Sequence, residues 1–298
     1  MSAAGPEHVA VMVAEVVGLV RACNPLVVVD ATVGTGGHAE ALLEATGAHL
    51  IGLDRDCGAL QVAARRLERF GARASLHRGN FAELSAILDH VGTPAVGAIV
   101  ADLGMSSFAL NDPARGFSFA AEGPLDMRMD DRQPLRAYDL VNEESEDEIA
   151  RLIQTYGEER HARRIARALV AARRRRPLET TGELRAAIEG VMGGRRHGGI
   201  NPATRTFQAL RIAVNDESAN LTALLAAGPA RLTAGGRMIV MAYHSLEDRP
   251  VKQRFRELAG AAGFALITRR AVRPAAAEIA RNRRARSARL RCLEKTLG

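Results

Sequence analysis

The sequence lacks paired cysteines, long apolar runs and the features of an export signal. Its three cysteines, Cys23, Cys57 and Cys292, are far apart and form no C-x-x-C pair, so we expect idle thiols in a reducing compartment and no metal site. No apolar run reaches the ~18 residues of a membrane span, and the first residues show no basic region followed by an apolar core. These absences argue against a disulfide scaffold and a membrane span, and they predict a cytoplasmic protein.

Length and charge narrow the class of protein. With 298 residues and 47% hydrophobic content, the chain is long enough to form one large domain or two modest ones. The net charge of +7 indicates a polyanionic partner, and two runs concentrate arginine: residues 160–176 hold eight and residues 269–291 hold nine. We expect these runs to bind nucleic-acid phosphates in a salt-dependent way, with a solvated surface as the ordinary alternative.

A strand, a glycine-rich loop and a helical pattern follow one another near the N-terminus. The β-branched run at residues 27–29 ends at Asp30 and leads into Gly34-Thr35-Gly36-Gly37. Because glycine has no Cβ, such a loop lets backbone N–H groups approach a ligand closely. A second strand ends at Asp54, whose carboxylate is suited to accept hydrogen bonds from the hydroxyls of an adenosine ribose. The unit predicts an adenosine-containing cofactor.

Two details distinguish between the adenosine cofactors. Residues 34–39 read G-x-G-x-x-A, which also fits the dinucleotide fingerprint, so a dehydrogenase and a ligand-free turn both stay open on the loop alone. The carboxylate of Asp30 suits a ligand that carries an ammonium and a sulfonium rather than a pyrophosphate, and the doubled glycine Gly36-Gly37 leaves room for an amino-acid tail. These features favour S-adenosylmethionine.

Helical and strand patterns alternate through the first third of the chain. We expect strands at residues 26–29, 49–53, 74–77 and 97–101, and helices at 7–20, 37–44, 57–69 and 82–91. Strands separated by helices predict an α/β class, with a mostly parallel, doubly wound sheet covered by helices on both faces. Ligands of such sheets bind at the carboxyl ends of the strands, where Asp30, Asp54, Phe81 and Asp102 fall.

The alternation stops between residues 109 and 206. This stretch shows only loops and helical patterns: a helix at 146–175 that is interrupted at Gly157, a helix at 181–191, and a glycine-rich loop at 193–199. The α/β pattern then resumes, with helices at 207–225 and 246–258 and strands at 237–243, 264–268 and 288–293. We therefore predict a core of residues 1–108 and 207–298 and an inserted helical domain, 109–206, that recognises the substrate.

Several longer motifs resemble those of one bacterial family. They are the blocks 117–119 (FSF), 123–129 (GPLDMRM), 156–160 (YGEER), 201–212 (NPATRTFQALRI), 244–249 (HSLEDR) and 284–287 (RARS). These blocks are similar to those of the ribosomal RNA small subunit methyltransferase H, or MraW, family, and the similarity extends from about residue 8 to residue 291. The resemblance implies a class I, Rossmann-like methyltransferase that uses S-adenosylmethionine to methylate N4 of a decoding-centre cytidine in 16S rRNA.

By position, the resemblance also implies a set of cofactor contacts. They are Gly34, Gly36, Gly37, His38, Asp54, Phe81 and Asp102. The sequence departs from the family at Phe108 and Ala109, where Pro and Gln are usual, at Asn201, where His is common, and in the N-terminal motif at residues 8–12. The change at Ala109 removes a polar side chain from the expected cofactor site.

The expected chemistry requires an acceptor for the target amine. The amine on C4 of cytosine is a poor nucleophile, because its lone pair is delocalised into the ring, so the protein must hold it in line with the methyl group and accept its hydrogen bonds. We assign this role to Asp102, with orientation of the cofactor as the alternative role. His38 is either a general base or a loop residue beside the methionine tail, and His244 either contacts RNA or caps the helix that follows it.

Basic and aromatic residues are candidates for RNA contact. We expect phosphate contacts to 16S rRNA from Arg160, Arg164, Arg205, Arg284 and Arg286. Phe117, Tyr138 and Tyr156 are candidates to stack on an unstacked base and Phe81 to pack on adenine, with core packing as the alternative for each. Two other functions stay open: methylation of DNA or a small molecule, and a non-catalytic RNA-binding ribosome-assembly factor that keeps the fold.

Overall fold

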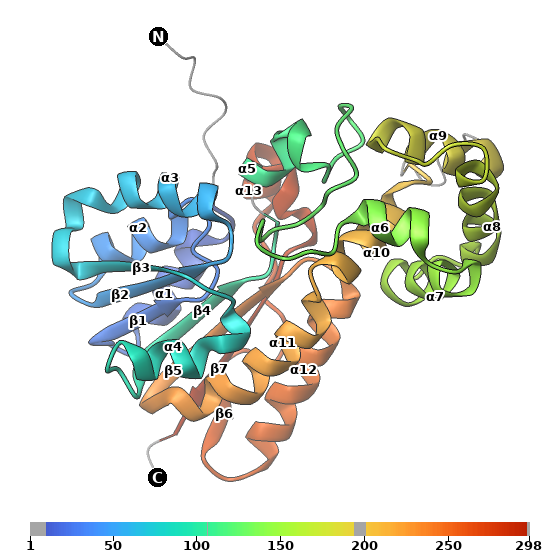
Figure 1. Cartoon of the computed structure of the whole chain (residues 1–298). Coiled ribbons are helices and arrows are strands. Elements are labelled where there is room, and N and C mark those ends of the chain that lie inside the picture. Colours follow the sequence, from blue (N-terminus) through green and yellow to red (C-terminus); the bar gives the residue numbers. More distant parts are fainter. Residues whose placement is uncertain (1–9, 106, 194–200, 297–298) are drawn as a thin grey trace. The chain divides into compact units, whose positions relative to one another are not determined.

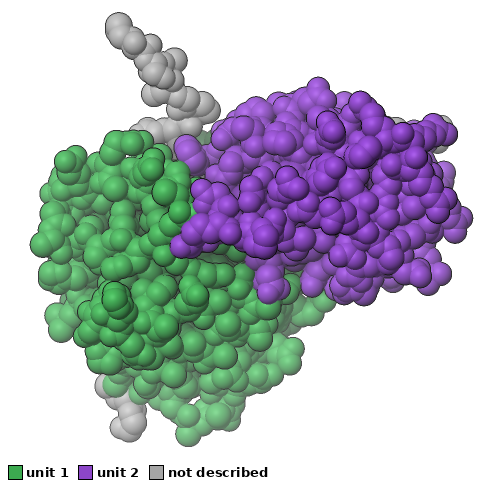
Figure 2. Space-filling view, in the orientation of Figure 1, with its two compact units in different colours: residues 1–106, 218–298 green, residues 107–217 purple. Residues whose placement is uncertain are grey.

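A computed structural model describes residues 10–105, 107–193 and 201–296 and shows a sheet in one part of the chain and helices in the other (Figure 1). Two units make up the chain (Figure 2): unit 1 comprises residues 1–106 and 218–298, and unit 2 comprises residues 107–217. Unit 1 contains the strands, so it holds the expected cofactor site.

Five neighbouring strands of unit 1 are parallel, as predicted. The strands are β1 Val27–Asp30, β2 His49–Asp54, β3 Ala74–Arg78, β4 Val96–Asp102, β5 Leu232–Ala242, β6 Phe264–Leu266 and β7 Arg289–Lys295. Their order across the sheet is β3-β2-β1-β4-β5-β7-β6. Strands β1 to β5 pair in parallel, whereas β7 is antiparallel to both β5 and β6. The α/β class with a mostly parallel sheet is therefore confirmed.

Both faces of the sheet are buried, because its central strands are apolar at nearly every position. Residues 96–101 of β4 are all buried. Adjacent residues of β1 point into different cores: Val28 packs in one cluster with residues of three helices, and Val29 packs in another cluster with residues of three other helices. Such two-sided burial is typical of parallel sheets in α/β proteins, and it leaves the strand ends as the place for polar chemistry.

The helices around the sheet differ from the predicted ones chiefly at their ends. They are α1 Val13–Arg21, α2 Gly37–Ala45, α3 Cys57–Leu67, α4 Leu84–His90, α11 Glu217–Ala227, α12 Ser245–Gly260 and α13 Ala276–Arg281. The carboxylate of Asp56 caps α3 by accepting from the Gly58 and Ala59 N–H groups. Residues 7–9 of the first predicted helix lie outside the described residues, and α13 has no counterpart in the prediction.

Unit 2 is helical, as expected for the insert. Its helices are α5 Ser107–Asn111, α6 Ala137–Glu143, α7 Glu146–Gly157, α8 Ala162–Arg173, α9 Thr181–Met192 and α10 Thr204–Val214. The predicted break at Gly157 is confirmed, because α7 ends there and Glu158 adopts the left-handed conformation. Thr180 and Glu183 form the capping box that starts α9. The predicted loop at 193–199 falls outside the described residues apart from Gly193.

The predicted single helix at 207–225 is wrong. The chain forms two helices, α10 and α11, because Asp216 has a φ of 48° and breaks the hydrogen-bond ladder between them. The amide of Asn215 accepts from Met129 N–H at 2.8 Å and donates to the Met127 carbonyl at 2.7 Å. Helix α10 also packs on α7 and α6. The compact unit 2 spans residues 107–217, and the substrate-recognition domain at 109–206 stays a prediction.

Two further properties concern the cysteines and the lengths and polarity of the helices. All three cysteines are free thiols, and burial raises the pKa of the Cys292 thiol to about 12. In the described part of the chain, every helix is too short or too polar to cross a bilayer.

Candidate functional site

The glycine loop after β1 is shaped by left-handed backbone conformations. Gly34 has a φ of 51° and Gly36 a φ of 86°, which side-chain-bearing residues rarely adopt. The Val33 N–H donates to the Leu53 carbonyl at 2.8 Å and ties the loop to β2. Gly36 then begins α2 as its N-cap. The loop therefore presents a helix N-terminus at the carboxyl end of the sheet, as the sequence predicts for an anion- or cofactor-binding turn.

Asp54 at the end of β2 holds the glycine loop in place. Its Oδ2 accepts from the Gly34 N–H at 2.8 Å, and its Oδ1 accepts from the Asp56 N–H at 2.9 Å. Burial raises the pKa of Asp54, and the two backbone donors act in the opposite direction. Each oxygen retains acceptor capacity after one hydrogen bond, so the carboxylate can still receive two hydroxyl donors.

Asp30 at the end of β1 carries an unfilled acceptor. Its side chain is 1% exposed, and its Oδ1 accepts from the Thr32 N–H at 3.2 Å. Within the described residues its Oδ2 is buried and has no hydrogen-bond partner. Burial raises the pKa of Asp30 to about 6, and the nearby His38 ring opposes that rise. A buried carboxylate oxygen without a donor is costly unless a ligand supplies one.

Asp102 at the end of β4 lies beside His38 and Tyr243. Its Oδ1 accepts from the Gly104 N–H at 3.2 Å, and its Oδ2 lies 3.8 Å from His38 Nδ1. The Tyr243 hydroxyl hydrogen-bonds the carboxylate, and burial together with this negative charge raises the pKa of the phenol. The Asp102 side chain remains 17% exposed. It is therefore both fixed by neighbours and open to a ligand.

His38 connects the N-terminal segment to this cluster. Its ring is 7% exposed, and Nε2 lies 2.8 Å from the Val11 carbonyl oxygen. A carbonyl only accepts, so Nε2 carries the hydrogen and the Nδ1 of a neutral ring presents a lone pair toward Asp102. The Met12 N–H donates to Glu278 of α13 at 2.7 Å, which holds the same segment from the other side.

The structure thus brings together most of the predicted cofactor residues in unit 1. His38, Asp102 and Asp54 all act electrostatically on Asp30. Phe81 follows β3 in the short turn η2, Phe81–Glu83, and packs against the core cluster on the α4 side of the sheet. Its packing on adenine stays a prediction. Ala109, which replaces the usual Gln, is buried in α5 of unit 2.

Sequence reasoning missed Tyr243. In the sequence it reads as the last apolar residue of the strand at 237–243, so nothing distinguishes its hydroxyl from a core aromatic ring. The signal available was its position, because it follows β5 at the same edge of the sheet as Asp102. A Cβ added to Gly104 would lie 2.5 Å from the Tyr243 ring, which shows how closely the loop after β4 covers it.

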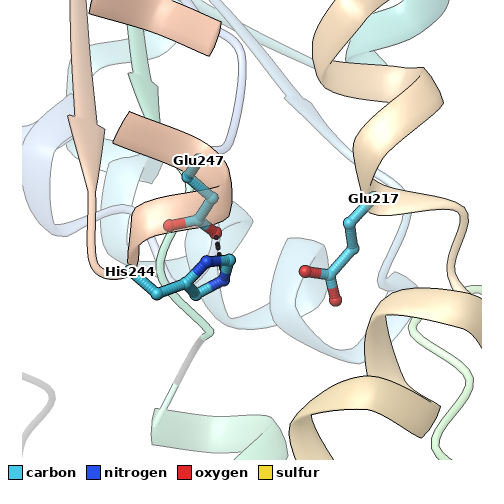
Figure 3. Close-up of side chains that lie close together, drawn as sticks. All are labelled: Glu217, His244 and Glu247. Carbon is cyan, nitrogen blue, oxygen red and sulfur yellow. Dashed lines mark ion pairs between the residues drawn. The ribbon is translucent and has the colours of Figure 1, made fainter. Parts of the chain in front are cut away.

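His244 pairs with a carboxylate of the helix that it begins. Figure 3 shows its ring facing Glu247, with Nε2 3.1 Å from Oε1. The other oxygen of Glu247 accepts from the Tyr243 N–H at 2.8 Å. His244 is the N-cap of α12, but its side chain makes no cap hydrogen bond. The pair instead fixes the turn between β5 and α12, and the predicted RNA contact of His244 stays untested.

The predicted RNA-binding arginines are exposed in both units. Arg160 lies in the turn just before α8, Arg164 lies in its first turn, and Arg284 and Arg286 lie in the short turn η5, Arg283–Ser287. Arg205 is exposed as well, but its guanidinium lies 3.4 Å from Glu159.

Other members of the two arginine runs have structural roles. Arg173 donates to the Val141 and Glu144 carbonyls, and Arg289 and Arg291 both bind the carboxylate of Asp248.

The three candidate stacking aromatics lie in unit 2. Phe117 is buried, and the Arg115 guanidinium lies 5.6 Å from its ring centre. Tyr138 is half-buried beneath Arg136, and Tyr156 is half-buried near the end of α7. Burial of Phe117 favours the core-packing alternative for that residue.

Comparisons with known proteins agree over nearly the whole chain. The profile of the MraW methylase family matches residues 5–296. Ribosomal RNA small subunit methyltransferase H of Sorangium cellulosum is 46% identical over 294 residues, which span 99% of this chain and 92% of that protein. The protein of the same name from Acidothermus cellulolyticus is 48% identical over 285 residues, 90% of this chain and 87% of that protein.

Solved structures show a more distant likeness. An rRNA methylase from Streptococcus thermophilus has 13% identity and a TM-score of 0.42, with 94% of this chain and 92% of that chain covered. The family profile and the curated relatives carry the assignment. The chain therefore belongs to the MraW methylase family, and its cofactor is S-adenosylmethionine, as predicted from the sequence.

Proposed function

We propose that this protein transfers a methyl group from S-adenosylmethionine to the N4 amine of a decoding-centre cytidine in the 16S rRNA of the small ribosomal subunit. The relatives named ribosomal RNA small subunit methyltransferase H support this, since they align over 92% and 87% of their own length. The observation that carries the chemistry is a set of acceptors at the ends of β1 and β4, of which Asp30 Oδ2 has no donor in the described residues. The same proposal places the protein in the cytoplasm.

The residues at the strand ends fit the cofactor. S-adenosylmethionine supplies an electrophilic methyl group on a sulfonium sulfur. The unpartnered Oδ2 of Asp30 is suited to the positive charge of the amino-acid tail, and Asp54 retains acceptor capacity for the ribose hydroxyls. The left-handed glycines Gly34 and Gly36 place no side chain on the loop at these two positions. Binding and orientation of the cofactor are therefore assigned to Asp30, Asp54 and the loop.

Asp102 is assigned to the target amine. Its carboxylate accepts a hydrogen bond from the amine and holds the amine nitrogen in line with the methyl group. Such positioning accounts for much of the rate of methyl transfer when the amine is a weak nucleophile. The Gly104 N–H and the Tyr243 hydroxyl fix the carboxylate in one orientation. Asp102 therefore needs no movement to meet the amine.

His38 is assigned the role of receiving the proton that the methylated amine releases. After transfer, the methylated amine carries one proton more than the neutral product, and Asp102 is the acceptor in contact with it. The lone pair on His38 Nδ1 lies 3.8 Å from Asp102 Oδ2 and can receive that proton in turn. The hydrogen bond from Nε2 to Val11 keeps the ring in this orientation.

Methylation of purified small subunits tests the proposal. The protein, S-adenosylmethionine and subunits from a strain that lacks the gene are combined, and mass spectrometry locates the new methyl group. We expect one added methyl on N4 of a decoding-centre cytidine. A methyl group at another atom, or no difference in that cytidine between parent and deletion strains, would overturn the proposal.

Ala109 is the one observation that favours a second function. The buried methyl group of Ala109 supplies no polar contact where the family usually has Gln. A ribosome-assembly factor that binds RNA without catalysis would tolerate that loss. Calorimetry separates the two functions, because a catalytic protein binds S-adenosylmethionine with measurable affinity and a non-catalytic one need not.

A further inference from the structure

A hollow in unit 1, away from the cofactor site, is lined by cations. It lies between α12 and the segment around β6, and its rim is formed by Lys252, Arg256, Arg269 and Arg291. Its floor is the ring of Phe255, which is 1% exposed, together with Leu266. The lining contains no acidic residue. We call this feature the α12 basic hollow.

The acids nearest to the α12 basic hollow are each paired with a cation, and for Asp248 one of these cations is the rim residue Arg291. Asp248 binds Arg289 and Arg291 at 3.0 and 2.7 Å, and Glu257 lies 3.6 Å from Arg254. Glu247 is occupied by His244. Among the described residues, no carboxylate lies within ion-pair distance of the other three rim cations, Lys252, Arg256 and Arg269, and all three are exposed.

A hydroxyl group adds a directed donor to these charges. The Thr268 oxygen lines the hollow and accepts from the Cys292 N–H at 2.8 Å. Its own hydrogen therefore remains to donate to another acceptor. Converging cations and a hydroxyl donor, without acids, match the oxygens of a phosphate group.

We propose that the α12 basic hollow binds backbone phosphates of the RNA substrate and positions unit 1 on it. The proposal rests on the proposed function, which makes RNA the polyanion that meets this surface. It adds a contact of the methyltransferase core that none of the family motifs contains. Three mobile cations without acidic partners release counterions when they meet phosphates, so the contact strengthens binding without reading sequence.

Paired double variants test the proposal. Arg256→Gln with Arg269→Gln removes two charges from the hollow. Arg21→Gln with Arg65→Gln removes two charges from exposed arginines at the ends of α1 and α3 and is the matched control. Binding to small ribosomal subunits is measured between 50 and 300 mM KCl (chosen as about the range over which phosphate contacts dominate), and calorimetry with S-adenosylmethionine reports on folding.

The expected result is a salt dependence that becomes shallower only in the hollow variant. Each lost phosphate contact lowers the slope of log K against log salt by about 0.7–0.9, so the double variant loses about 1.5. Cofactor affinity stays unchanged in both variants. Arg256→Lys with Arg269→Lys keeps the charges and restores the slope.

Two results would overturn the proposal: an unchanged slope in the hollow variant, or an equal loss in the control variant. Failure of the proposed function has a different signature. A wild-type protein that binds subunits with the hollow-dependent slope but adds no methyl group refutes the methylation and leaves the hollow established.

Discussion

The carboxylate of Asp30 is buried, its Oδ2 lacks a partner in the described residues, and its pKa rises to about 6 from the ordinary 3.8. The folded state therefore binds this proton more tightly than the unfolded state does. The contribution of the protonated Asp30 carboxyl to the stability of the folded state is fully present below about pH 4 and is lost as the pH rises through about 6. The full loss amounts to about 3 kcal/mol. The same ionised carboxylate is what a cationic cofactor requires.

Asp30→Asn is expected to change stability in a pH-dependent way. Asn keeps the acceptor for Thr32 and removes the buried charge, so the free energy of unfolding of the variant relative to wild type rises by about 2 kcal/mol between pH 4 and pH 8. Urea denaturation of the cofactor-free protein at both pH values measures the difference. Calorimetry is the companion measurement, because the variant loses the charge that we propose binds the cofactor. A stability difference that is the same at both pH values would contradict the account.

Asp102→Asn is expected to separate turnover from cofactor binding. The amide oxygen still accepts from Gly104, so the loop keeps its shape, but the negative charge proposed to receive the amine proton is gone. Single-turnover methylation is expected to fall by about 100-fold or more, while the Kd for S-adenosylmethionine changes by only a few-fold. Full turnover with unchanged cofactor affinity would show that Asp102 is not the acceptor.

The carboxylates of the candidate site were predictable because the end of an apolar strand can be recognised from the sequence. Asp30, Asp54 and Asp102 each follow an apolar run, and parallel strands bring such ends to one edge of the sheet. The pairing of His38 with the Val11 carbonyl could not be read, since it depends on where the segment before α1 lies in space. The hydroxyl of Tyr243 was missed because this residue reads as the last apolar residue of its strand.

Secondary structure elements were predictable where a long apolar pattern ended at a residue that terminates helices or strands. Gly157 ended α7 as expected, and the β-branched strands of the sheet were found within a few residues. The break at Asn215 and Asp216 was missed because the apolar spacing continues across it without Gly or Pro. The antiparallel direction of β7 is not encoded in its own residues, since strand direction follows from the path of the chain.

Substitution of Asp216 tests the turn between α10 and α11. Its φ of 48° is readily adopted by glycine and strongly disfavoured for a β-branched residue. Asp216→Gly is expected to raise the free energy of unfolding by about 0.5 kcal/mol, and Asp216→Val to lower it by about 1–2 kcal/mol. Asp216→Asn, which tolerates the same conformation, is the control. Equal stability of the Gly and Val variants, measured by urea denaturation, would mean that the turn adjusts without strain.

The charge of the whole molecule does not by itself identify the surface proposed to contact RNA. The net charge is +7, yet many of the arginines are already paired with acids inside the protein. The unpaired ones among the described residues include Arg160 and Arg164 on unit 2. Total charge is therefore a poorer guide to RNA contact than the subset of arginines without a carboxylate neighbour.

Arg164→Ala and Arg151→Ala compare an unpaired with a paired arginine of unit 2. The side chain of Arg151 binds Glu148, whereas Arg164 is exposed on α8. Both substitutions remove one positive charge. Loss of Arg164 is expected to weaken binding to small subunits and to lower the salt slope by about 0.9, and loss of Arg151 to change it by much less. Filter binding at several salt concentrations measures both, and equal slopes for the two variants would refute the distinction.

The pairing of β4 with β5 spans the insertion, because unit 2 lies between these neighbouring strands in the sequence. Closing a loop of more than 100 residues costs about 4 kcal/mol when the loop is unstructured, so the two central strands meet late in folding. During synthesis, the first four strands emerge long before β5, and the apolar edge of β4 stays unpaired until β5 has been made. A nascent chain of this protein is therefore most exposed to aggregation while the ribosome translates the insertion, and early folding of unit 2 shortens the free loop and with it that delay.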